Sequence, residues 1–146
     1  MATLYPILLA VISGVAISIQ AQMMGLMDQG MGTKESVFIT YLGGGVLATL
    51  AILFSKGGNL QAWPGVPWYA FTAGLFGLII VGTIGYIVPH LGLAKGFVIV
   101  TASQFVSAVV LDQFGLLGAT VRTLDANRIL GLGVLMVGVW LVLRSS

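Results

Sequence analysis

FVIVTASQFVSAVVLDQFGLL, residues 97–117, decides the fold class, because it is as long and as apolar as a membrane-spanning helix. As an α-helix it would measure about 30 Å, close to the thickness of a bilayer's hydrocarbon core. Twelve of its side chains are Val, Ile, Leu or Phe, and each of these favours insertion by about 0.3–0.6 kcal/mol. We therefore predict a transmembrane helix over this stretch.

The same stretch carries polar residues, among them Ser103, Gln104, Asp112 and Gln113. An aspartate near the middle of a span opposes insertion by about 2.5–3.5 kcal/mol, and the glutamines oppose it further. An isolated helix of this sequence would be only marginally inserted. We therefore expect the helix to lie in a bundle, with its polar groups facing other helices or a wet cavity rather than lipid.

The composition of the whole chain gives the same class. Of 146 residues, 58% are apolar and 7% charged, whereas a soluble domain carries about 25% charged residues. The mean hydropathy is +1.09. We predict an all-α polytopic membrane protein, a single transmembrane domain over residues 1–146, with spans at about 4–26, 36–54, 69–88, 97–117 and 128–143.

Composition also argues against several classes of function. Little sequence lies outside the spans, so a soluble catalytic domain is excluded. The chain has no Cys and one His, His90, which has no carboxylate neighbour, so we expect no enzyme, no metal site and no cofactor. A net charge of +2 is too small to indicate nucleic-acid binding. The N-terminus lacks the basic region of a signal peptide, so we read it as the first retained span.

Polar and small residues elsewhere suggest where helices meet. Gln20 lies in the first span and either faces a pathway or only bonds a neighbouring helix. The glycines of the second and third spans would allow close helix packing; they are Gly43, Gly44, Gly45, Gly74 and Gly77. The alternative, a phosphate cradle at the triple glycine, lacks a basic partner. Thr33 and Asp125 are the predicted N-caps of the second and fifth spans.

The basic residues of the short loops show no bias between the two sides of the membrane. Counting loops alternately places Lys56, Arg122 and Arg128 on the side of the N-terminus, and an equal number on the other; these are Lys34, Lys95 and Arg144. Since a Lys/Arg excess sets orientation, an even count predicts insertion both ways and pairing with an inverted second copy. The alternative is that unequal charge positions fix one orientation.

Three segments resemble the YdcZ family of the drug/metabolite transporter superfamily. They are Pro89-His90-Leu91-Gly92, Thr101-Ala102-Ser103-Gln104, and Asp112-Gln113-Phe114-Gly115-Leu116-Leu117-Gly118. The likeness extends over nearly the whole chain. It implies about five spans, a bacterial inner (plasma) membrane location and a transporter, with some members working as antiparallel homodimers. It does not supply a substrate.

Within one helix, Gln104 and Asp112 lie about 80° and about 12 Å apart, so they can line one broad face. In an inverted dimer Gln104 would lie near mid-membrane and Asp112 nearer one mouth. A carboxyl that is buried can bind a proton near neutral pH, which suits a coupling acid. The alternative is that Asp112 pairs with a nearby Lys or Arg, or caps a broken helix, and only fixes the fold.

Our leading hypothesis is a secondary transporter that works by alternating access, with Gln20, Ser103 and Gln104 binding cargo and Asp112 coupling it to protons. Because the sequence offers Asp112 no obvious buried cation, we expect a cationic or polar amphipathic cargo. The expected partners are the lipid bilayer, a second inverted copy and a small molecule or ion. A small ion channel and a non-transporting assembly subunit are the alternatives.

Overall fold

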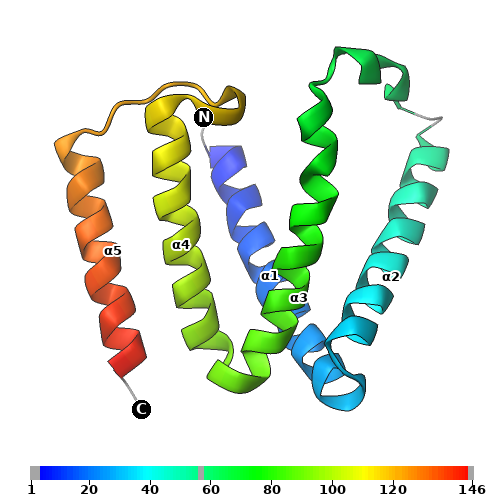
Figure 1. Cartoon of the computed structure of the whole chain (residues 1–146), viewed down its shortest axis with the longest axis horizontal. Helices are drawn as coiled ribbons and strands as arrows, with labels where there is room; N and C mark the ends of the chain where they lie inside the picture. The colour runs from blue at the N-terminus through cyan, green and yellow to red at the C-terminus, as the bar shows by residue number, and fades with distance from the viewer. Residues whose placement is uncertain (1–3, 56–57, 145–146) are drawn as a thin grey trace. The chain divides into compact units, whose positions relative to one another are not determined.

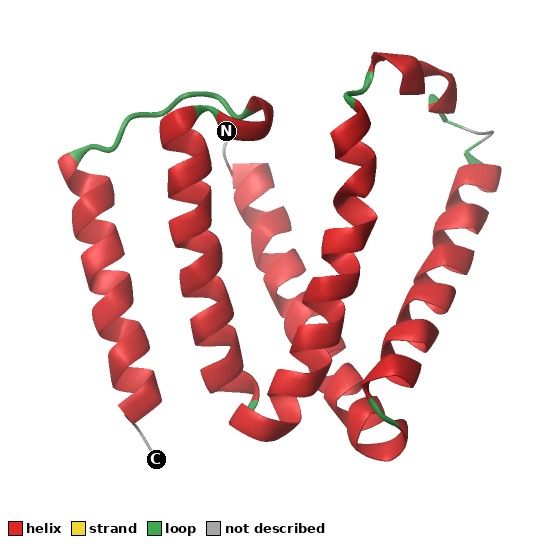
Figure 2. Cartoon of the chain, viewed as in Figure 1, coloured by secondary structure: helices red, strands yellow, loops and turns green. Residues whose placement is uncertain are grey.

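The computed structural model describes residues 4–55 and 58–144, and these are all helix, turn and loop (Figures 1 and 2). Five helices are long and apolar enough to cross a membrane, which confirms the predicted all-helical membrane fold. Their bounds are α1 Leu4–Met31, α2 Thr33–Phe54, α3 Ala73–Leu91, α4 Leu93–Phe114 and α5 Ala126–Arg144. Three short 3-10 helices, η1 Leu60–Gly65, η2 Trp68–Thr72 and η3 Leu116–Gly118, lie in the connections.

The chain divides into two compact units, Met1–His90 and Leu91–Ser146. The first contains α1, α2 and nearly all of α3. The second contains α4 and α5.

The connection between α1 and α2 is a single residue, Gly32. Its φ of 98° lies in a region that favours glycine, which allows two long helices to follow each other without a loop. The predicted loop at residues 28–35 is therefore almost entirely helical. The prediction of Thr33 as N-cap is wrong, because Gly32 holds that position and the Thr33 hydroxyl donates to the Asp28 carboxylate instead.

The first unit is held together where small residues let the helices approach closely. Ser36 of α2 is 0% exposed, and its hydroxyl donates to the Met24 carbonyl of α1 at 3.3 Å. Gly85 of α3 lies against both residues, since a Cβ there would be 3.4 Å from the Met24 Cε. A Cβ at Gly25 of α1 would lie closer still to a neighbour, the Val88 side chain of α3. These contacts are van der Waals packing of the kind that joins helices in lipid.

We expect Gly25→Ala to destabilise the protein by about 1–3 kcal/mol, because the added methyl would lie 2.8 Å from Val88 Cγ1 and overpack the crossing. Gly14→Ala in the same helix is the matched control, since a Cβ at Gly14 meets no atom within 4 Å. The measurement is the melting temperature of the purified protein in detergent. A Gly25→Ala variant that melts at or above the parent temperature would contradict the packing described here.

In the second unit, α4 begins four residues earlier than predicted and ends three residues earlier. Gly92 precedes it with φ 82°, and Gly115 ends it in the left-handed conformation at φ 60°. A left-handed glycine is a common helix terminator, so the predicted end at residue 117 is wrong. The prediction of Asp125 as the N-cap of α5 is confirmed, because the Asp125 Oδ1 accepts a hydrogen bond from the Arg128 N–H at 2.9 Å.

Candidate functional site

The predicted site residues are divided between the two units. Gln20 lies on α1 of the first unit, and Ser103, Gln104 and Asp112 lie on α4 of the second. Each unit therefore has its own set of candidate residues.

Asp112 lies in the last turn of α4 and forms an ion pair with Arg128 in the first turn of α5. The Arg128 Nη1 and Asp112 Oδ2 are 3.7 Å apart, and the two side chains are 31% and 36% exposed. Asp112 thus has a cation within reach, although Arg128 is partly exposed and is not the buried cation that the sequence analysis looked for. The pair links the adjoining ends of α4 and α5 and leaves both groups accessible.

The connection after α4 is tied to the same place by backbone hydrogen bonds. The Arg122 N–H donates to the Asp112 carbonyl at 3.0 Å, and the Leu124 N–H donates to the Gln113 side-chain oxygen at 2.7 Å. Arg128 also donates to the Arg122 carbonyl at 3.4 Å. Gln113, which the sequence marked as costly in a span, thus serves the connection at the helix end. Its nearness to Gly115 was the signal that could have placed it there.

The other two polar residues of α4 differ in what they contact. The Ser103 hydroxyl donates to the Ile99 carbonyl of its own helix at 2.8 Å, so its hydrogen-bonding need is met locally. Gln104 is exposed, and no hydrogen bond of its amide is found within the described part of the chain. In a membrane, an amide on such a surface needs a partner from a neighbouring helix, from water or from cargo.

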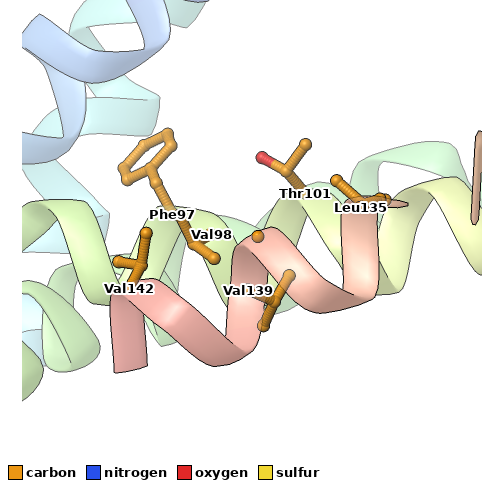
Figure 3. A pocket seen from close by; sticks show the side chains of 7 residues that line it. Phe97, Val98, Thr101, Leu135, Val139 and Val142 are labelled. Carbon is orange, nitrogen blue, oxygen red and sulfur yellow. The ribbon is translucent and has the colours of Figure 1, made fainter. Parts of the chain in front are cut away.

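An open groove of about 380 Å³ runs between α4 and α5 (Figure 3). It is lined almost entirely by apolar side chains, and the hydroxyl of Thr101 is its polar group; the lining residues are Phe97, Val98, Thr101, Leu135, Gly138, Val139 and Val142. Gly138 widens it, because a Cβ there would meet no atom within 4 Å. The sequence analysis did not predict this groove.

In the first unit, Gln20 borders two adjoining grooves. One, of about 390 Å³, lies among α1, α2 and α3 and is lined by Gln20, Thr40, Tyr41, Gly44, Gly45, Ala48 and Val81. The other, of about 410 Å³, is lined by Ala16, Ile19, Gln20, Met23, Met24, Met27 and Thr40. The Gln20 amide is exposed on an otherwise apolar surface. Thr40 and Tyr41 belong to this surface, and the sequence analysis did not single them out.

The glycines predicted to pack helices behave differently from one another. A Cβ at Gly77 would collide with the Tyr41 hydroxyl, so the end of the long Tyr41 side chain of α2 reaches α3 there. A Cβ at Gly43, Gly44, Gly45 or Gly74 would meet no atom within 4 Å. The packing role of these four glycines stays a prediction. It would require another helix to lie against them.

Comparison with known proteins identifies one family. The sequence model of the family described as "Putative inner membrane exporter, YdcZ" matches residues 5–141. No match was found among curated proteins or among solved structures.

Proposed function

The chain belongs to the YdcZ family of inner membrane exporters, and on that basis we propose that it is a secondary transporter that moves a small molecule by alternating access between two inverted copies. The family and the five spans make it an integral inner membrane protein and a membrane transporter in general terms. The proposal adds the pathway, the partner and the coupling.

The observation that carries the proposal is the exposure of Gln20 and Gln104 on membrane-spanning helices. Each amide lies on an exposed helix surface, far from the helix ends where water could reach it. Polar side chains at that depth are costly against lipid and are usually turned to a bundle interior or a wet cavity. A second copy of the chain would supply that interior. Gln20, Ser103 and Gln104 would then contact cargo.

Inverted pairing is supported by the positions of the charges. Lys34 and Lys95 lie in the first turns of α2 and α4, and Arg128 lies in the first turn of α5. All three are therefore at helix ends, where a Lys/Arg bias would act on orientation. Lys56, the remaining basic residue of the second connection, lies outside the described residues.

Orientation is tested by fusing a reporter to the C-terminus. We expect a topology reporter that is active only in the cytoplasm, and one that is active only outside it, to give comparable signals when each is fused to the chain. The even Lys/Arg count is the reason. Signal from only one of the two reporters would end the proposal of an inverted pair.

Asp112 remains the proposed coupling acid, since its carboxylate is accessible and its ion pair with Arg128 is long and partly exposed. A carboxylate favours a cationic or polar amphipathic cargo, although Arg128 already supplies one positive charge. The reading in which Asp112 only fastens α4 to α5 is favoured by the same ion pair. The two are separated by the Asp112 experiment described in the Discussion.

Transport is tested with purified protein in liposomes under an imposed pH gradient. We expect uptake of organic cations that saturates with concentration and stops when the gradient is dissipated. Fast currents that do not saturate would instead indicate the alternative, a small ion channel. If a broad set of cations gives neither uptake nor current, the assembly subunit is the favoured alternative.

A further inference from the structure

The ion pair between Asp112 and Arg128 is held weakly by its surroundings. A separation of 3.7 Å between charged atoms exceeds an ordinary hydrogen bond, and each side chain is about one third exposed. Arg128 has a second acceptor in the Arg122 carbonyl, so its guanidinium keeps a partner if it leaves Asp112. Exposed pairs of this kind contribute about 0.2–1 kcal/mol. The pair can therefore open at small cost.

The ion pair and the groove between α4 and α5 lie along one seam. On α4, Thr101 and Asp112 are eleven residues apart, which places them about 20° apart around the helix and about 16 Å apart along it. On α5, Arg128 shares a face with Leu135 and Val139, which follow it by seven and eleven residues. The groove of Figure 3 and the charged pair thus lie on matching faces of the two helices, about 16 Å apart along α4.

Large and small apolar residues both lie between the groove and the pair, since helical spacing also puts Phe105 of α4 and Leu132 of α5 on these faces. Ala108 lies on the α4 face between Thr101 and Asp112, and Gly131 lies near the α5 face between Arg128 and Leu135. A Cβ at Gly131 would meet no atom within 4 Å. The seam therefore offers an apolar surface over several turns, with a carboxylate at one end.

We propose that this seam binds an amphipathic organic cation, with its apolar body against α4 and α5 and its charged head at Asp112, and that Arg128 is a built-in competitor for the same carboxylate. The inference rests on the proposed transporter function and names the cargo class and its regulation. With the site empty, Arg128 neutralises Asp112. When the cation binds, Arg128 leaves Asp112, keeps its hydrogen bond to the Arg122 carbonyl and turns to the interface, where long basic side chains are readily solvated.

Removing the competitor should tighten binding. We expect the purified full-length Arg128→Gln variant to bind a long-chain alkyltrimethylammonium ion about two- to fivefold more tightly than the parent, as measured by equilibrium dialysis in detergent, because the ion no longer has to break the pair. Arg122→Gln is the matched control. It removes the same charge six residues earlier, in the connection that leads into α5, but Arg122 makes its contacts through its backbone, so the affinity of this variant should equal that of the parent.

Two further variants test the two ends of the site. Asp112→Asn should lose most of the binding, and Gly138→Leu should weaken it by filling the groove. Circular dichroism melting in the same detergent identifies any variant that has unfolded, and Arg128→Lys, which keeps the competing charge, should bind like the parent.

The outcomes separate this inference from the function on which it rests. A folded Arg128→Gln variant that binds no more tightly than the parent overturns the competitor role. Unchanged binding in Asp112→Asn overturns the cation site, and unchanged binding in Gly138→Leu overturns the place of the apolar body. If the affinities change as expected but the parent transports no cation in liposomes, the site stands and the transporter proposal fails.

Discussion

Replacing Asp112 with asparagine is expected to abolish transport driven by a pH gradient while leaving the protein folded and its oligomeric state unchanged. Asparagine has nearly the same size and can accept hydrogen bonds, but it binds no proton at physiological pH. The ion pair that is lost is partly exposed, so its removal should cost at most about 1 kcal/mol of stability. Uptake in liposomes and melting in detergent measure the two effects.

Asp125→Asn is the matched control for this experiment. It removes the same charge from the same end of the second unit. Asparagine caps helices as well as aspartate does, so the hydrogen bond to the Arg128 N–H should persist. Transport by this variant should remain within about twofold of the parent, since its cap is worth about the same. If Asp112→Asn instead unfolds the protein or dissociates the proposed dimer, the aspartate is structural and the proposal that it couples protons fails.

The second large effect is expected from variants forced into one orientation. Gln29→Arg combined with Arg122→Gln leaves four basic residues on one side and two on the other, and Gln61→Arg combined with Lys34→Gln gives the opposite bias. All four replaced side chains are exposed. Each biased variant should insert in a single orientation and, without an inverted partner, should lose at least about tenfold of its transport.

Producing the two biased variants in the same cell should restore transport, because each supplies the orientation that the other lacks. Uptake into cells expressing one variant or both measures this directly, and the reporter fusions verify the orientations. Full activity in either variant alone would show that an inverted partner is not required. Failure of the mixed cells, with both variants inserted as intended, would refute the inverted arrangement as the active form.

The sequence was most informative where apolar runs are long. Five spans could be predicted because burying a backbone in lipid requires unbroken helices, and length and hydropathy are enough to find them. The ends were less predictable. A single glycine, Gly32, replaced a predicted loop, and Gly115 ended α4 before residue 117, because both depend on a local backbone conformation that hydropathy does not record.

Asp112 shows why the site was harder to predict than the fold. The sequence marked it as a costly carboxylate within a span, whereas the structure places it in the last turn of α4 beside Arg128. The eleven-residue connection between the helices brings the two together, and its path depends on the turn at Gly115 and on the Gln113 hydrogen bond. The groove between α4 and α5 was missed for a similar reason, since it needs the register of two helices.

The one-residue joint at Gly32 bears on how the protein would meet a protease. With α1 ending at Met31 and α2 beginning at Thr33, that end of the first unit presents almost no flexible chain to cleave. The opposite end of the first unit carries the long connection between α2, which ends at Phe54, and α3, which begins at Ala73. An externally added protease should therefore cut the first unit at one end only. In a membrane where both orientations coexist, sealed vesicles would show about half of the chains cut and the other half shielded.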